Sequence, residues 1–138
     1  CPHFFFFLLI TIKIAAKIQF MFVNLIIASV AVLHLNFLIL EMFFWTKPWG
    51  LRVFRQSKDH ARATAVLAAN QGLYNGFLAA GLIWGLIKAD PTLSLQIKLF
   101  FLSCVSVAGI YGAITVNKRI FFMQALPALC AIVGLRFF

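Results

Sequence analysis

Residues 63–87 read ATAVLAANQGLYNGFLAAGLIWGLI, a run of 25 positions without a charged side chain. A helix of about 20 predominantly apolar residues crosses a bilayer, so this run predicts a membrane-spanning helix. Near its middle lie three amides and a phenol, those of Asn70, Gln71, Tyr74 and Asn75. A polar side chain in hydrocarbon needs a partner, and we therefore expect this group to face the interior of a helix bundle or a wet cavity.

The composition of the whole chain also indicates a membrane protein. Of the 138 residues, 64% are hydrophobic and only 11% are charged, and the mean hydropathy is +1.02. A soluble domain of this size cannot hide so much apolar surface, whereas a bilayer solvates it directly. The net charge of +9 would suggest nucleic acid in a soluble protein, but the basic residues lie between the apolar runs. We therefore expect the lipid bilayer, and no nucleic acid, as a partner.

Four apolar runs predict an all-α fold, a polytopic membrane protein built as a four-transmembrane-helix bundle. The expected spans lie at about residues 18–44, 60–87, 93–116 and 119–137. We assign residues 21–138 to a single domain and residues 1–20 to an N-terminal extension, because the apolar run before Lys13 is too short to span and Met21 offers a start. The alternatives for residues 1–20 are a prolongation of the first helix or an interfacial segment.

The connection between the first two spans is expected to carry a short amphipathic helix on the membrane surface, at about residues 51–57. Asp59 is the expected cap of the second span, and Asp90 or Thr92 the expected cap of the third, because these side chains take up free amide groups at a helix start.

The distribution of basic residues predicts the orientation. The loops 45–62 and 117–119 hold seven Lys and Arg residues, against five in the rest of the chain: two in the N-terminal segment, Lys88 and Lys98 around the start of the third span, and Arg136 in the tail. By the positive-inside rule, the protein is a multi-pass protein of the cell membrane with these two loops in the cytoplasm and both termini outside.

Small residues along the second and third spans predict close packing of helices. In the second span the glycines form two Gly-x-x-x-Gly pairs. The expected packing residues are Gly72, Gly76, Gly81, Gly85, Gly109 and Gly112. The bulky residues of the second span are expected to meet lipid.

Several blocks of sequence resemble a known family. They are Leu40-Glu41-Met42-Phe43 followed by Trp45, the long block Ala68 to Ala79, and the blocks Gln96 to Phe101 and Ala108 to Ala113. Together they are similar to the small integral-membrane family catalogued as domain of unknown function 1304, over about residues 21–135. The resemblance implies a four-helix membrane protein of bacterial type, and it implies no activity.

The polar side chains within the spans are the candidate ligand-binding residues: His34, Glu41, Asn70, Gln71, Tyr74, Asn75, Tyr111 and Thr115. Our hypothesis is binding or transport of a small-molecule or lipid ligand, with Glu41 or His34 exchanging a proton and with two copies forming a homodimer. One alternative is that these residues are interhelical glue in a structural or interaction protein. The other is a membrane enzyme acting on a lipid or quinone, with His34 and Glu41 as acid and base. For Glu41 alone, an ion pair with Lys47 near the membrane surface is favoured over proton coupling.

Enzyme chemistry has less support in the sequence than binding. No serine-hydrolase, metalloprotease, phosphate-loop, haem or zinc spacing occurs in the chain. His34 and Glu41 are seven residues apart, about 10 Å along a straight helix, which is too far for one metal. We expect no metal and no cofactor, and a protein that is not an enzyme is favoured.

Overall fold

A computed structural model of the chain describes residues 2–136, with side chains from Phe7 to Arg136, and this described part is all-α, without a strand. Its elements are α1 (Pro2–Ile39), the π-helix η1 (Leu40–Phe44), α2 (Pro48–Phe54), α3 (Lys58–Ile87), α4 (Pro91–Thr115), the π-helix η2 (Phe121–Ala125) and α5 (Leu126–Leu135). The all-α class expected from the sequence is confirmed.

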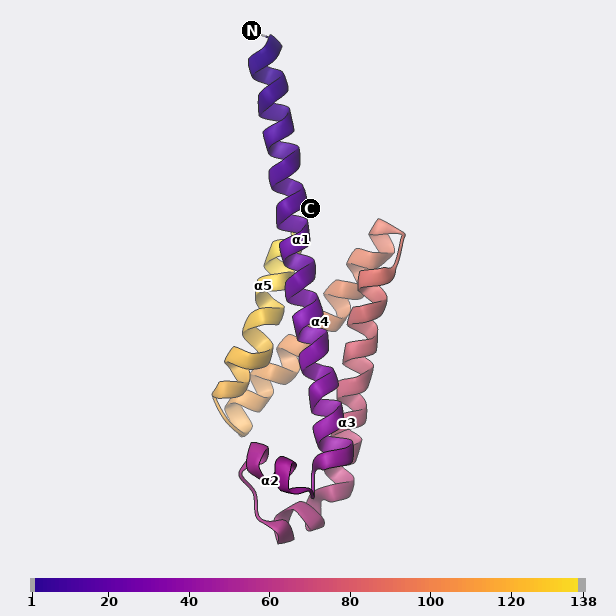
Figure 1. The fold of residues 1–138 in the computed structure, drawn as a ribbon, viewed down its shortest axis with the longest axis vertical. Helices are drawn as coiled ribbons and strands as arrows, with labels where there is room; N and C mark the ends of the chain where they lie inside the picture. The colour runs from indigo at the N-terminus through magenta and orange to yellow at the C-terminus, as the bar shows by residue number, and fades with distance from the viewer. Residues whose placement is uncertain (1, 137–138) are drawn as a thin grey trace.

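The long helices lie side by side (Figure 1). α1 packs against α3 and α5, α3 packs against α4 and η1, and α4 packs against η2 and α5. The N-terminal part of α1 continues beyond the other helices (Figure 1), and its side chains from Phe7 to Phe22 are exposed. Residues 2–20 therefore prolong the first helix, which is one of the two alternatives considered for this segment.

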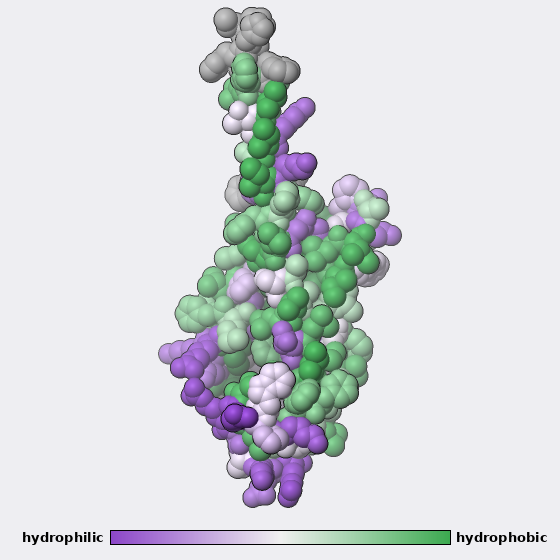
Figure 2. All heavy atoms as spheres, in the orientation of Figure 1, coloured by the Kyte–Doolittle hydropathy of each residue, from purple (hydrophilic) through white to green (hydrophobic). Residues whose placement is uncertain are grey.

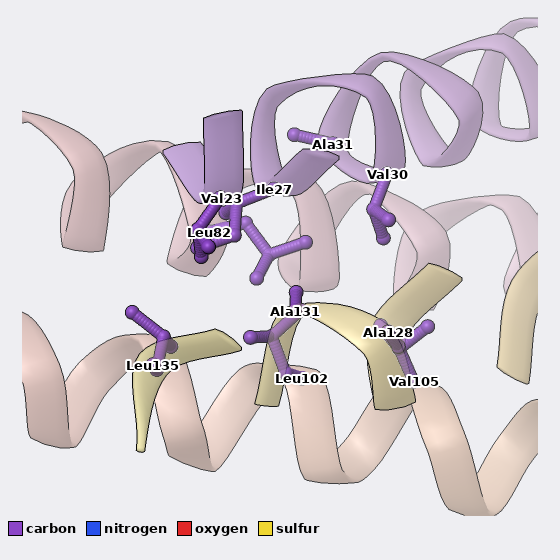
Figure 3. Packing of buried hydrophobic residues seen from close by; sticks show 10 residues of the cluster. All are labelled: Val23, Ile27, Val30, Ala31, Leu82, Leu102, Val105, Ala128, Ala131 and Leu135. Carbon is purple, nitrogen blue, oxygen red and sulfur yellow. The ribbon is translucent and has the colours of Figure 1, made fainter. Parts of the chain in front are cut away.

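Buried apolar side chains from α1, α3, α4 and α5 meet in one cluster (Figure 3). Its members are Val23, Ile27, Val30, Ala31, Leu82, Leu102, Val105, Ala128, Ala131 and Leu135. α5 contributes two alanines, whose small side chains let neighbouring helices approach closely. The interior of one chain is thus filled by packed side chains, with Ile27, Leu82 and Leu102 completely buried.

Apolar side chains also cover much of the outside. Val66, Ile114 and Ile87 are 83%, 80% and 75% exposed. Figure 2 shows apolar residues over the body of the molecule and hydrophilic residues at the end that carries α2 and the start of α3, where Arg52 and Lys58 are exposed. An apolar surface of this extent marks contact with lipid or with another protein.

Two helices within the described residues are long and apolar enough to cross a membrane by length and composition, Phe7–Phe44 and Pro91–Thr115. α3 has 30 residues, but its amides, alanines and glycines make it less apolar. Phe121–Leu135 is a shorter apolar helix. Helices therefore occur at all four expected places, and two of them have the composition of a span.

The helix ends differ from the sequence-based expectation at two points. Ser57, not Asp59, caps α3: its Oγ accepts a 3.2 Å hydrogen bond from the backbone N–H of His60, because the helix begins early enough to place Asp59 inside the first turn. The surface helix α2 begins at Pro48 rather than near residue 51, since proline suits the first turn, where no N–H donor is needed. At α4, Asp90 is the cap and accepts from the N–H of Leu93 at 2.6 Å.

Two π turns interrupt the α-helical geometry. In η2 the N–H of Leu126 bonds to the carbonyl of Phe121, five residues back. The next residue, Pro127, has no N–H and cannot continue the regular ladder, which accounts for a π turn at this point. η1 lies at the end of α1 and contains Glu41; π turns of this kind occur frequently at functional sites.

Candidate functional site

A carboxyl group and an amide meet between η1 and α3. Asn75 Nδ2 donates a 2.8 Å hydrogen bond to Glu41 Oε2. Asn75 is 6% exposed and Glu41 is half-buried. The expected ion pair between Glu41 and Lys47 is wrong, because Glu41 turns toward α3 while the side chain of Lys47 is exposed.

Gly72 and Gly76 allow this contact by letting α1 and η1 lie directly against α3. A Cβ atom on Gly72 would lie 2.8 Å from Met42 Cγ, 3.1 Å from Glu41 Cβ and 3.2 Å from the carbonyl oxygen of Leu38. A Cβ atom on Gly76 would lie 2.5 Å from Leu38 Cδ1. The first Gly-x-x-x-Gly pair is therefore the surface over which Glu41 reaches Asn75.

The pair lies deep along α3. Asn75 is the central residue of the uncharged run 63–87, with 12 uncharged residues on each side. At 1.5 Å per residue it is about 18 Å along the helix from either end of that run. Because Gly72 lies against Glu41, the carboxyl group is far from the ends of α3, although it is only a few residues from the end of η1.

The second oxygen of the Glu41 carboxyl group is not fully buried and has no hydrogen-bond partner among the described residues. Asn75 bonds to Oε2, and no hydrogen bond is formed at Oε1. Within the described part of the chain, no fully buried side-chain nitrogen or oxygen lacks a hydrogen-bond partner, so Oε1 is not sealed in the interior. A cation or a hydrogen-bond donor of a ligand has an acceptor there.

The other polar residues of α3 and α4 are not brought to this pair. Asn70, Gln71 and Tyr74 are exposed on α3, and Tyr111 and Thr115 are exposed on α4. The expectation that the polar sector of α3 faces inward within one chain is therefore wrong for three of its four members. The reason is that α1 packs on the small residues of α3, and Asn75 alone of the four lies on the same helical face as Ala68, Gly72 and Ala79.

His34 occupies a separate buried position on α1. It is 1% exposed, its Nδ1 donates to the carbonyl oxygen of Val30 at 2.9 Å, and its ring meets that of Phe37 edge-on. Glu41 has its own partner in Asn75. The two residues proposed as an acid and base pair therefore make separate contacts.

The structure also contains a buried cation that sequence analysis missed. Lys98 of α4 is 3% exposed, and its Nζ donates a 3.0 Å hydrogen bond to Asn24 Oδ1 of α1. The Nζ atom also lies 5.4 Å from the centre of the Phe20 ring. Lys98 is not among the candidate residues that the sequence indicates; its position inside an apolar helix, seven residues after Pro91, could have identified it.

The remaining expected packing glycines lie at helix contacts as well. Gly81 faces the ring of Phe101, Gly85 faces Lys98 and Ile97, and Gly112 faces Ile120. At Gly109, a Cβ atom would lie 2.7 Å from the backbone nitrogen of Ala125 in η2. These glycines of α3 and α4 thus lie where a neighbouring helix is in close contact.

Within the described residues, no group of three or more His, Cys, Asp or Glu side chains is placed to hold a metal ion.

Together, the fold and its contacts define a small all-α protein with an apolar surface and isolated polar contacts between closely packed helices. Residues 28–135 match the family described as a protein of unknown function, DUF1304, and the chain belongs to this family. The resemblance noted in the sequence is thereby confirmed. A curated relative, "Uncharacterized protein YpaA" of Lactococcus lactis subsp. lactis (strain IL1403), is 32% identical over 97 residues, which cover 69% of this chain and 80% of the relative. No solved structure matches the chain.

Proposed function

We propose that this chain is a multi-pass protein of the cell membrane that binds or transports a small molecule at the Glu41–Asn75 pair. α1 with η1, α3, α4, and η2 with α5 would form its four crossings. The exposed apolar side chains on these helices support a lipid environment. The last crossing is short, and Arg136 extends its reach because a long basic side chain can snorkel to the headgroups.

The proposed orientation places the loop 45–62, which contains α2, and the loop 117–119 in the cytoplasm. α2 and the start of α3 carry exposed basic residues, and Lys118 and Arg119 are exposed in the connection that follows α4. Trp45 lies at this end, donating to Thr64 Oγ1 at 3.1 Å and packing on the ring of Phe54. Tryptophan between an apolar helix and a basic segment suits the membrane interface.

The hydrogen bond between Asn75 and Glu41 is the observation that carries the binding proposal. A carboxyl group within a membrane is costly and faces a bundle interior or a water-filled path in most known cases. Here one carboxyl oxygen is held by an amide, and the other has no hydrogen bond and is not fully buried. The arrangement supports a ligand that presents a cation or a hydrogen-bond donor to Oε1.

The same geometry supports a mechanism in which protonation of Glu41 is coupled to binding and release of the ligand. In its charged form Glu41 accepts from Asn75 and attracts a donor; in its protonated form the attraction to a cationic ligand is lost. Binding and release can therefore alternate with protonation of one side chain. Two copies would be needed to make a path, because the interior of a single chain is filled around Ile27 and Leu82.

A structural role for the pair is the second candidate, favoured by the close packing at Gly72. A structural role requires only the hydrogen bond between the two helices. Glu41→Gln retains an acceptor for Asn75, so this variant would leave a structural role intact. Ligand binding through the charge would be lost in the same variant. The two functions therefore differ in their response to one substitution.

The test is native mass spectrometry of protein gently extracted from its own membrane. We expect a small molecule to remain bound to the wild type and to the control Asp59→Asn, which removes an exposed acid of α3. We expect it to be absent from Glu41→Gln. If Glu41→Gln retains the same bound species, or if the wild type carries none, the binding proposal is wrong, and a lower stability of Asn75→Leu alone would then assign the pair to structure.

A further inference from the structure

Lys98 carries a buried positive charge for which the described chain provides no carboxylate. The sequence holds only three acids, Glu41, Asp59 and Asp90. Glu41 is bonded to Asn75, and Asp59 lies in the first turn of α3, at the other end of that helix from Gly85 and Lys98. Asp90 accepts from the N–H of Leu93 and precedes Lys98 by eight residues, about 12 Å along the helix. Among the residues that the structure describes, Asn24 therefore solvates the ammonium group and no acidic side chain neutralises it.

The position of Lys98 is determined by the packing around its stem. A Cβ atom on Gly85 would lie 2.8 Å from Lys98 Cγ, so the stem crosses α3 where that helix has no side chain. Asn24 and Phe20 of α1 then receive the Nζ atom. The ammonium group is thereby held between three helices rather than free to move to the surface.

A hollow of about 330 Å³ opens beside this ammonium group. It is lined by Phe20, Pro91, Thr92, Ser94, Leu95, Lys98 and Leu135. Its volume lies within the range of roughly 300–1,000 Å³ typical of small-molecule sites. The lining combines apolar side chains with the polar residues Thr92, Ser94 and Lys98, so the hollow is suited to an amphiphile rather than to a purely apolar or purely ionic ligand.

We propose that this hollow binds an anionic phosphate or carboxylate group that neutralises Lys98, with an attached apolar group against Phe20 and Leu135. The Lys98 ammonium has three donors, of which Asn24 takes one, so a donor is left for the anion. A charge-assisted hydrogen bond in a site with little water is stronger than one between neutral groups. The anion could be the headgroup of a membrane lipid or a free phosphate compound. This site is separate from the Glu41–Asn75 pair, and the inference does not depend on the function proposed for that pair.

The experiment compares retention of phosphatidylglycerol and phosphatidylcholine by native mass spectrometry, in mixed micelles of stated composition. We expect the wild type to retain the anionic lipid at least about tenfold more strongly than the zwitterionic one. Lys98→Met, which keeps an unbranched stem, should lose this selectivity. Lys88→Met, which removes an exposed lysine at the same end of the molecule, is the matched control and should retain it.

A second variant covers the case in which Lys98→Met does not fold. Thr92→Trp changes an exposed residue that lines the hollow, so it fills the site and leaves every charge in place. Loss of selectivity in every one of these two variants that folds supports the proposal; wild-type selectivity in either folded variant, or no selectivity in the wild type, overturns it. Inorganic phosphate added to the wild type distinguishes a free phosphate compound from a lipid headgroup as the source of the anion. Release of the lipid by millimolar phosphate indicates a site for free anions. Undiminished retention of the lipid indicates a site for the lipid headgroup.

Discussion

Gly72→Ala should loosen the contact that positions Glu41. The added methyl group would lie 2.8 Å from Met42 Cγ, 3.1 Å from Glu41 Cβ and 3.2 Å from the Leu38 carbonyl oxygen. The methionine can change rotamer, but the other two atoms move only with the backbone of α1 and η1. α1 and η1 must therefore shift away from α3 by a few tenths of an ångström, and the 2.8 Å bond between Asn75 and Glu41 lengthens with them.

The size of the effect follows from two opposing contributions. Overpacking by a methyl group costs about 1–3 kcal/mol. Alanine is favoured over glycine within a helix by about 0.8–1.0 kcal/mol. The net expectation is a loss of about 0–2 kcal/mol in the free energy of unfolding, accompanied by weaker holding of the Glu41 carboxyl group.

Gly112→Ala is the matched control, because its added methyl group would meet only side-chain atoms of Ile120, the nearest at 3.1 Å. That side chain can yield, so the helix preference should prevail and the variant should be as stable as the wild type or up to about 1 kcal/mol more stable. Unfolding in mixed micelles, followed by tryptophan fluorescence, measures both variants. Gly72→Ala should be the less stable of the two variants by about 1 kcal/mol or more, and a Gly72→Ala variant as stable as Gly112→Ala would refute the inference that the approach of η1 to α3 depends on Gly72.

Three further predictions concern the polar contacts, the caps and the topology. Asn75→Leu should lower the free energy of unfolding by about 1 kcal/mol, the value of a side-chain hydrogen bond in lipid, whereas Glu41→Gln should change it little; an equal loss in both would show that the charge itself stabilises the fold. Ser57→Ala should cost about 1 kcal/mol by removing the cap of α3, and Asp59→Ala less, as judged by thermal unfolding; the reverse order would contradict the assignment of the cap. Single cysteines that replace Arg55 or Asp90 in a cysteine-free variant should lie on opposite sides of the membrane. In oriented vesicles, a membrane-impermeant thiol reagent should therefore label each of them from a different side. Labelling of both from the same side would exclude the proposed crossing of α3.

The helices and their closest contacts could be predicted from the sequence because both depend on local composition. Long uncharged runs separated by basic or proline-containing segments indicated helices at all four expected places, and glycine spacing indicated the contact at Gly72. The cap of α4 was expected at Asp90 or Thr92, both next to Pro91, and the structure has it at Asp90. The cap of α3 was assigned to Asp59 instead of Ser57, because the exact first residue of a helix depends on small differences between neighbouring caps.

The directions of the polar side chains could not be predicted with the same success. Helical periodicity places Asn70, Tyr74 and Asn75 on defined faces, but it does not say which face a neighbouring helix covers. In α3 the small residues decide this, so Asn75 is buried and Tyr74 is 55% exposed. The burial of Lys98 could not be predicted for a related reason. An isolated lysine in an apolar helix can extend to the surface or be held inside the bundle. Lys98 is held inside because Gly85, on the neighbouring helix, has no side chain at the point of contact.

The two π turns are each matched by a glycine on the facing helix. Gly72 lies against η1 at Glu41 and Met42, and Gly109 lies against η2 at Ala125. A π turn is wider than an α turn because its hydrogen bonds close one residue later, and the missing side chain on the partner provides the room. Deletion of one residue from η1 would narrow the turn and leave a void that a larger residue at position 72 could fill. The length of η1 and the size of the side chain at position 72 are therefore linked, and we expect an insertion or deletion in η1 to be tolerated better when residue 72 changes with it.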